Sequence, residues 1–258
     1  MRNWTLAALP LALAMTVTAC DSAERQEGAP AERSGSTDAP RAADAGPVAT
    51  KSFALAGFSA VKAAGPDDVT IRRGEAFSIT AKGPQSVLDE LEIVLEGDTL
   101  SIGRKREGFS FSRRGDEGVE ISVTLPRLTA VRLTGSGSID ADSLDGDSVA
   151  AEVTGSGDLK IDRLTGKRAD ISVSGSGDIE IDGGTVSTGE YSITGSGDID
   201  ADGLVAQTLD VSVTGSGSVD GNATGSASIN ILGSGDVTLA GGGKCTSRKM
   251  GSGTVTCK

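Results

Sequence analysis

The sequence predicts an all-β protein whose main part is a single-stranded parallel β-helix with coils of about 20 residues. Three observations lead to this class. Gly-Ser-Gly triplets recur at intervals of 20 residues that shorten slightly toward the C-terminus. Apolar and polar residues alternate on both sides of each triplet, which indicates half-buried strands. The order of the motif never reverses, so neighbouring strands run in parallel. The triplets begin at Gly135, Gly155, Gly175, Gly195, Gly215, Gly233 and Gly251.

Residues 1–19 are predicted to be a lipoprotein signal peptide. Arg2 supplies a positive start, and the apolar run 6–17 is too short to span a membrane as a stable helix. The run ends in Val-Thr-Ala-Cys, which resembles a bacterial lipobox, in which the peptidase cuts before the cysteine and Cys20 carries the lipid. The alternative is an ordinary secretory signal in which Cys20 is incidental. The register of small residues, cysteine and apolar run favours the lipobox.

Residues 20–50 are predicted to be the lipidated cysteine followed by a disordered tether. The segment consists of Ala, Pro, Gly, Ser and charged residues, with Val48 as its one apolar β-former. Such a composition buries too little apolar surface to offset the entropy of ordering. About 30 residues of this chain would reach roughly 30 Å root-mean-square.

Residues 51–130 are predicted to form an N-terminal β segment that precedes the repeats. Residues 69–71 and 77–79 alternate as strands do, and residues 84–91 can hold a short helix. Residues 93–95 and 100–102 flank Glu-Gly-Asp, which indicates a hairpin.

Residues 103–118 are a polar excursion with the chain's one basic and aromatic patch. We interpret it as a solvated loop that covers a sheet edge, and the alternative is a contact for acidic glycans or a membrane surface. The patch consists of Arg104, Lys105, Arg106, Phe109, Phe111, Arg113 and Arg114.

Residues 131–258 are predicted to be the repeat β-helix, in which the triplets form corners. Glycine supplies dihedral angles that are closed to other residues and lets coils approach without a Cβ between them. The serine of each triplet is expected to hydrogen-bond its neighbour in the next coil. The apolar columns expected to face inward begin at Val131, Leu133, Ile139 and Ala141 and repeat with each coil.

The composition excludes several classes of function. The chain has no histidine, which removes Ser-His-Asp and Cys-His catalysis and every His-ligated metal site. The net charge is −12, so nucleic acid is not expected as a partner. No cofactor is expected. Residues 198–203 match the start of a calcium loop, but its twelfth position would be Leu209 and not the glutamate that such a loop needs.

Two columns of charged residues follow the repeat. One column contains several acidic residues and a single lysine. A polysaccharide-active enzyme could use an acidic residue and the neighbouring lysine as its acid and base, but the favoured interpretation is a row of solvated charges. In the other, like charges at coil spacing repel, so either the side chains cap backbone amides or a cation lies between them. Capping is favoured. The columns are Asp140, Lys160, Glu180, Asp200, Asp220, and Asp142, Asp162, Asp182, Asp202.

Cys245 and Cys257 are predicted to form a disulfide that closes the end of the solenoid. Removal of the lipidated Cys20 leaves an even pair in an oxidising compartment. A metal site is the rival hypothesis, but two cysteines without histidine give too few ligands.

Seven triplets in register resemble the head GIN domain family, the putative auto-transporter adhesins. The segments GFSAVKAAGPDDVTIRRGEAFSITAKGP, LDELEIVLEGDTLSIGRK and VEISVTLPRLTAVRLTGSGSI look like the strands that precede the repeats in that family. The similarity covers roughly residues 53–258. It implies a bacterial envelope protein with a right-handed β-helix similar to that of pectin lyases, without their catalytic residues. Parallel crossovers are themselves overwhelmingly right-handed.

Three functions are consistent with these features. The first is a lipid-anchored, non-enzymatic adhesin or binding module of the cell envelope, facing the periplasm or the outer surface. Its partners would be the membrane, through the N-terminal lipid, and an envelope glycan or another surface protein. The second is a polysaccharide-active enzyme on the same fold. The third is a structural envelope protein without a ligand.

Overall fold

The protein folds as a β-solenoid, and the all-β class is confirmed. The structure is a computed structural model that describes residues 47–105 and 118–258, all within the compact unit of residues 43–258. Apart from the single-turn helix α1 (Gln85–Glu90), the regular elements of this part are strands. They are β1 (Val48–Phe53), β2 (Ala60–Gly65), β3 (Asp68–Arg73), β4 (Ser78–Pro84), β5 (Leu91–Glu96), β6 (Thr99–Arg104), β7 (Glu120–Leu125), β8 (Ala130–Gly135), β9 (Ser138–Ala141), β10 (Leu144–Gly155), β11 (Asp158–Ile161), β12 (Leu164–Gly175), β13 (Ile179–Ile181), β14 (Gly184–Gly195), β15 (Ile199–Gly215), β16 (Ser218–Gly233), β17 (Asp236–Ala240), β18 (Lys244–Gly251) and β19 (Val255–Cys257).

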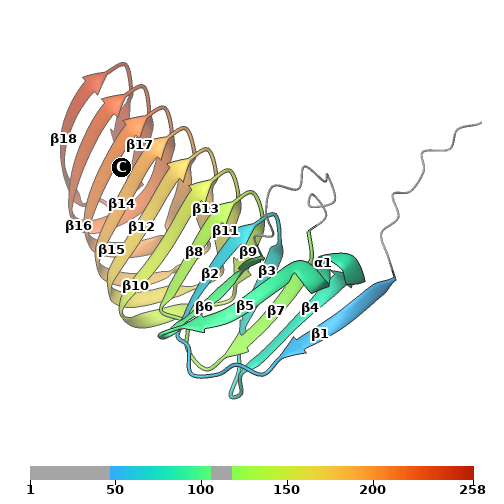
Figure 1. The fold of residues 1–258 in the computed structure, drawn as a ribbon. Coiled ribbons are helices and arrows are strands. Elements are labelled where there is room, and N and C mark those ends of the chain that lie inside the picture. Colours follow the sequence, from blue (N-terminus) through green and yellow to red (C-terminus); the bar gives the residue numbers. More distant parts are fainter. Residues whose placement is uncertain (1–46, 106–117) are drawn as a thin grey trace, which may run out of the picture. The chain divides into compact units, whose positions relative to one another are not determined.

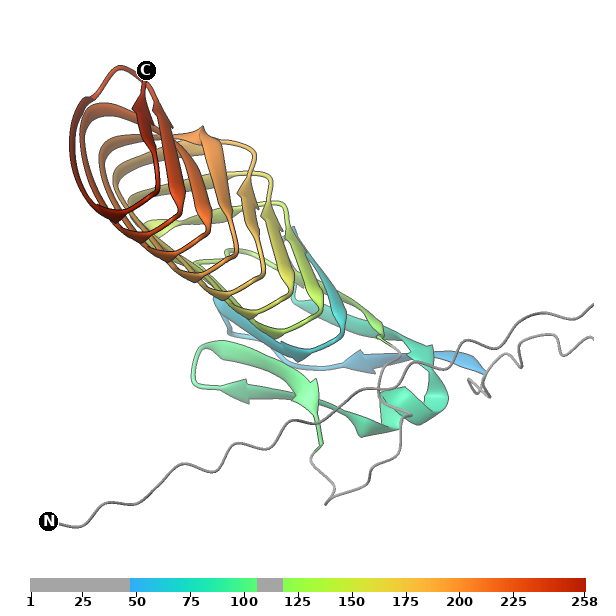
Figure 2. The same ribbon diagram turned by 90° about the horizontal axis from the view of Figure 1, so that it is seen from above.

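Successive coils pair in parallel, and the predicted repeat is confirmed. Val131 lies beside Ala151 and Ala151 beside Ile171, an offset of one 20-residue coil. Toward the C-terminus the offset shortens, so that Ile229 lies beside Ser247. Figures 1 and 2 show these coils as a stack. We name the strands before the Gly-Ser-Gly corners the upstream strip (β8, β18 and the ends of β10, β12, β14, β15 and β16) and the strands after them the downstream strip (β9, β11, β13, β17, β19 and the starts of β15 and β16).

The coils from β10 to β16 contain a third strand segment that the sequence analysis did not predict. Residues 144–149 of β10 pair with residues 164–169 of β12 before the chain bends into the upstream strip. Leu144 and Val149 point inward from this segment and are buried. The signal was present in the sequence, because Leu144, Leu164 and Leu204 follow the coil spacing.

The interior is a stack of apolar columns, as predicted. Up to β17, the inward residues of both strips are at most 3% exposed, so each Val, Ile or Leu contributes roughly 1.5–3 kcal/mol through burial. Tyr191 is the one aromatic side chain inside the described coils, and its hydroxyl has no hydrogen-bond partner among the described residues. Gly189 and Gly221 make room for its ring, because a Cβ at either position would lie within 3.4 Å of it.

The corner glycines are required for two different reasons. Gly195 has a φ of 136°, which L side chains rarely adopt, and a Cβ there would lie 2.1 Å from the Gly175 oxygen. Gly197 needs no unusual φ, but its Cβ would lie 2.0 Å from the Gly177 oxygen. Both glycines therefore permit the close approach of coils.

The expected serine ladder is formed by backbone groups and not by hydroxyls. The Ser196 N–H donates to the Gly175 oxygen at 2.8 Å, and Ser176 does the same to Gly155. In the described part of the chain, the triplet hydroxyls form no hydrogen bond, and these serines are exposed. The backbone N–H groups of the corner are already hydrogen-bonded to the preceding coil, so the serine hydroxyl faces solvent.

The N-terminal strands do not simply precede the solenoid, because β2 and β3 form one of its coils. β2 pairs in parallel with β8, and β3 with β9, so that Gly65 occupies the corner beside Gly135. On its other side this coil meets β6 and β7, which come later in the chain. The alternation in residues 60–72 matches that in 130–142, which is the signal that could have located this coil.

The remaining N-terminal elements cover the first coil. The predicted hairpin is confirmed, because β5 pairs with β6 in antiparallel fashion, and the predicted helix is α1, which buries Val87 and Leu88. β1 and β4 extend the downstream side as further antiparallel strands. β1 begins at Val48, three residues before the boundary expected at residue 51.

A buried ion pair fixes the corner of the first coil. Asp67 is 3% exposed, and its carboxylate lies 2.6 Å from the Arg104 guanidinium and accepts the Val119 N–H. Arg104 was expected to belong to a solvated basic patch, but it ends β6 and is largely buried. Lys105 is exposed, as expected, and its ammonium donates to the Asp89 oxygen at 3.0 Å. The other residues of that patch, from Arg106 to Arg114, lie outside the described residues.

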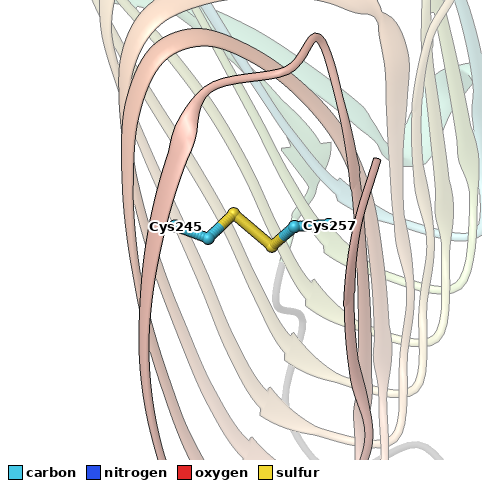
Figure 3. The surroundings of a disulfide bond; sticks show 2 residues. All are labelled: Cys245 and Cys257. Atoms are coloured by element: carbon cyan, nitrogen blue, oxygen red, sulfur yellow. A yellow bond between two sulfur atoms is a disulfide. The ribbon is translucent and has the colours of Figure 1, made fainter.

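The last coil is closed by the predicted disulfide, which is confirmed. Cys245 and Cys257 are bonded and point toward each other across the coil (Figure 3). Cys257 lies beside Leu239, the inward column predicted for it, and Cys245 lies beside Ala227. Lys249 takes the place of Ile231 in an inward column, and its ammonium donates to the Gly253 oxygen at 2.8 Å. Polar and covalent contacts thus replace apolar packing at this end.

Candidate functional site: a charged strip along the solenoid

The outward side chains of the downstream strip form a regular charged surface, which we call the charged strip. Inward Ile and Leu residues alternate with these outward residues, so the buried columns fix their spacing. Register pairs Lys160 with Asp140 on one side and with Glu180 on the other. The charged strip consists of Arg72, Asp140, Lys160, Asp162, Glu180, Asp182, Asp200, Asp202 and Asp220.

In the first half of the charged strip, cations and carboxylates alternate. The Lys160 ammonium lies 2.7 Å from Glu180 and 3.0 Å from Asp182. Arg72 lies 3.2 Å from Asp140 and 3.9 Å from Asp162. Hydrogen bonds to Glu180 and Asp182 raise the pKa of Lys160. The hydrogen bond from Lys160 in turn lowers the pKa of Asp182. Lys160 therefore stays protonated at neutral pH.

The second half of the charged strip holds acids alone. Asp200 lies beside Glu180 and Asp220 in the register. Burial raises the pKa of Asp200, and the neighbouring charges of Asp202, Asp220 and Glu180 add to this effect. This half therefore holds carboxylates under mutual repulsion.

The charged strip is open to solvent. A hollow of about 380 Å³ is lined by Ser138, Asp140, Asp158, Lys160 and Glu180, among others. The Lys160 side chain is 40% exposed and that of Glu180 55% exposed, so neither is shielded from water. The surface can hydrogen-bond a polar ligand, but it does not enclose one.

A second open hollow lies over the third strand segment. It measures about 600 Å³, and ion pairs cross it between Arg127 and Asp145 and between Lys167 and Asp147. Thr165 and Thr185 also line it. This surface is again polar and hydrated.

The expectation that one aspartate column caps backbone amides holds at one position of four. Asp142 accepts the Arg73 N–H at 2.7 Å. Asp162 and Asp182 are neutralised instead by Arg72 and Lys160, and no hydrogen bond or ion pair to the Asp202 carboxylate is found within the described residues.

Capping is performed by a different set, the aspartates that follow the Gly-Ser-Gly triplets. Asp178 accepts the Asp198 N–H at 2.9 Å, and Asp198 accepts the Ser218 N–H at 2.6 Å. Asp236 accepts the Thr254 N–H, and hydrogen bonds from the Thr254 hydroxyl and N–H lower the pKa of Asp236. Three of the four aspartates that follow a triplet are therefore structural, and their recurrence at coil spacing was the available signal.

The charged strip offers little for catalysis or metal binding. A lysine that is kept protonated by two carboxylates is a poor general base. Among residues 47–105 and 118–258, no three acids or cysteines are placed to hold a metal ion.

The predicted anchor stays a prediction. Cys20 and the preceding leader lie outside the described residues. No helix within the described part is long and apolar enough to cross a membrane.

Fold and surface together define a class of protein: a β-solenoid that presents an open, regularly charged strip on a rigid stack of coils. The family model described as "Putative auto-transporter adhesin, head GIN domain" matches residues 57–243, which is more than half of the chain. The chain therefore belongs to this family, and the resemblance inferred from the triplets is confirmed.

Several solved structures share this fold. A protein of Bacteroides fragilis described as a putative adhesin is 19% identical, with a TM-score of 0.69 over 82% of this chain and 97% of its own. A protein of Parabacteroides distasonis described as a putative lipid binding protein is 22% identical, with a TM-score of 0.64 over 82% and 96%. A putative adhesin of Parabacteroides merdae gives the same values. No curated protein matches the chain.

Proposed function

We propose that this protein is a lipid-anchored, non-enzymatic binding module of a bacterial cell envelope. The observation that carries the proposal is the charged strip, in which donors and acceptors repeat at coil spacing on a rigid stack. Membership of a family described as adhesins supports a binding role. The solenoid is taken to be right-handed, as parallel crossovers almost always are.

The anchor in this proposal is Cys20. The leader 1–19 would be removed, and the lipid on Cys20 would hold the mature chain at the membrane. The segment 20–50 would act as a tether between the membrane and the solenoid, facing the periplasm or the outer surface. Replacement of Cys20 by Ser and fractionation of cells tests this part, and a variant that still partitions with membranes would contradict it.

A glycan of the envelope is the ligand class that fits the charged strip best. Protein interfaces depend on a few buried apolar or aromatic anchors. Within the described part of the chain, every large apolar side chain that is exposed lies outside the charged strip. The ligand must therefore be recognised through hydrogen bonds and charge, as hydroxyl-rich or amino-bearing sugars can be. Such contacts stay hydrated, so affinity is expected to be modest and to rise with ligand valency.

Two other functions remain as alternatives to test. A polysaccharide-active enzyme would need an acid and a base with matched pKa values. The hydrogen bonds between Lys160 and Asp182 raise the pKa of the lysine and lower that of the aspartate, so both groups stay charged near neutral pH and neither is poised to transfer a proton. A purely structural envelope protein would show no saturable ligand at all.

A glycan array probed with the full chain tests the binding function. We expect retention on a subset of bacterial-surface glycans, loss of retention in Lys160→Gln, and retention in the control variant Lys167→Gln. Lys167 is also paired with a carboxylate, at 3.1 Å, but lies on the third strand segment. Equal binding by both variants would contradict the assignment of the charged strip.

A further inference from the structure

Each end of the upstream side of the solenoid is a strand that pairs on one side only within the described residues. β18 pairs with β16 at the C-terminal end, and β5 pairs with β6 at the N-terminal end. Within residues 47–105 and 118–258, neither strand pairs on its other side. Figure 1 shows β18 and β5 at opposite ends of the same run of strands. Unpaired N–H and C=O groups on such edges are templates for another strand.

The large apolar side chains that are exposed in the described chain lie toward the two ends of the solenoid. The described residues include five large exposed ones, and all five lie in terminal strands or next to one. Leu232 and Met250, 52% and 68% exposed, lie side by side in β16 and β18. Val94 and Leu95 belong to β5, and Val48 begins the edge strand β1. The middle coils keep their large apolar residues inside, so the ends are the parts of the surface suited to burial.

The two edges carry opposite charge. Residues 244–258 contain four basic and no acidic side chains, whereas residues 85–98 contain five acidic and no basic side chains. The basic residues are Lys244, Arg248, Lys249 and Lys258, and the acidic residues are Asp89, Glu90, Glu92, Glu96 and Asp98.

The spacing of these charges matches across an antiparallel pair. Lys244 and Arg248 point outward from β18, four residues apart, and Glu92 and Glu96 point outward from β5, also four apart. β5 runs opposite to β6, whereas β18 runs parallel to the rest of the upstream side, so the two edges of two stacked copies would meet antiparallel. The register that opposes Glu92 with Arg248 also opposes Glu96 with Lys244.

We propose that copies of this chain associate head to tail, with β18 of one copy pairing with β5 of the next. The contact adds about six backbone hydrogen bonds across residues 91–96 and 244–249. It places two pairs of opposite charges directly across from each other. None of these four side chains has an ion-pair partner elsewhere in the described chain.

The same charges select this arrangement over the symmetric ones. Two β18 edges would oppose cations with cations, and two β5 edges would oppose acids with acids. Cationic edge strands are a known device against pairing with an identical edge. A head-to-tail contact is heterologous, so it can repeat into an open filament. The disulfide ties β18 to β19 and keeps the terminal edge from fraying.

Sedimentation of the full chain in detergent tests the proposal. The contact is small, so we expect association at concentrations of roughly 10 μM to 1 mM, weakened by salt. A tail variant (Lys244→Glu with Arg248→Glu) and a head variant (Glu92→Lys with Glu96→Lys) should each stay monomeric. An equimolar mixture of the two should recover at least the mass of the wild type, because every contact is again complementary.

The control carries Arg168→Glu with Glu190→Lys, two exposed charges in the middle coils. It should associate as the wild type does. Three results would overturn the proposal: a wild type that stays monomeric throughout, single variants that associate normally, or a mixture that stays monomeric. Recovery in the mixture also shows that both variants are folded. If the wild type stays monomeric and instead binds an acidic peptide at β18, this edge belongs to a different partner and the proposal is wrong.

Discussion

Replacement of Gly197 by Ala probes the close approach of coils on which the solenoid depends. The added Cβ would lie 2.0 Å from the Gly177 oxygen and 2.8 Å from a methyl group of Val173. Because the nearest partner is backbone, the two coils must move apart by roughly 1 Å, as in overpacking. This movement weakens two hydrogen bonds to the Gly175 oxygen, from the Ser196 N–H at 2.8 Å and the Gly197 N–H at 3.2 Å.

The expected loss in the free energy of unfolding is roughly 2–4 kcal/mol. Each hydrogen bond contributes about 1 kcal/mol, and overpacking adds about 1–3 kcal/mol. Alanine also reduces the conformational entropy of the unfolded chain, which offsets only about 0.4–1 kcal/mol of this loss. At this chain length each kcal/mol corresponds to roughly 2–4 °C in Tm.

Thermal unfolding followed by circular dichroism measures this loss, with Ser196→Ala as the matched control. Ser196 is exposed and its hydroxyl is unbonded within the described residues, so the control should stay within about 0.5 kcal/mol of the wild type. The reasoning fails if Gly197→Ala is as stable as the wild type. It also fails if the serine variant loses as much stability as the glycine variant.

Three further variants test other parts of the structure. Tyr191→Phe removes a buried hydroxyl without a described partner and should raise the free energy of unfolding by roughly 1–3 kcal/mol. Burial raises the pKa of Tyr191 above the value of 10.0 in an unfolded chain, so ionisation of this group does not affect the free energy of unfolding below pH 10 and lowers it as pH rises above 10, where the unfolded tyrosine ionises. Tyrosinate absorbance from this single tyrosine should therefore appear only with alkaline unfolding, and ionisation in the folded state would refute this. The double variant Cys245→Ser, Cys257→Ser should lose about 3 kcal/mol, and an unchanged Tm would show that the bond does not hold the last coil. Arg104→Met leaves the buried Asp67 carboxylate without its ion-pair partner and should lower the free energy of unfolding by about 3–5 kcal/mol. The control Lys82→Met breaks the exposed pair with Glu120 and should lower it by less than about 1 kcal/mol. Equal Tm values for the two variants would contradict the role of the buried pair.

The repeat could be predicted from sequence because each coil imposes the same geometric requirement. Inward positions such as Val131 and Ile139 recur at coil spacing, and the corner glycines accept no Cβ, so both leave a periodic pattern. Cys257 could be placed for the same reason, since its column is fixed by the register with Leu239.

The features that depart from the 20-residue repeat were not predicted in this way. The coil of β2 and β3 is joined to its neighbours by segments distant in sequence, and its corner replaces Gly-Ser-Gly with Gly65, Pro66 and Asp67. The burial of Arg104 depends on that same corner. For the charged strip, the columns could be read from the repeat, but the ion-pair partners could not. A long side chain such as Lys160 can reach residues of two columns, and only the three-dimensional structure shows that it contacts both Glu180 and Asp182.

The measurement that tests the proposed function most directly is a binding titration with the glycan that the array selects. The full chain should bind it saturably and return it chemically intact after prolonged incubation, and Lys160→Gln should bind it at least tenfold more weakly than Lys167→Gln does. Cleavage of the glycan, or equal affinity for the two variants, would contradict a non-enzymatic binding module that acts through the charged strip.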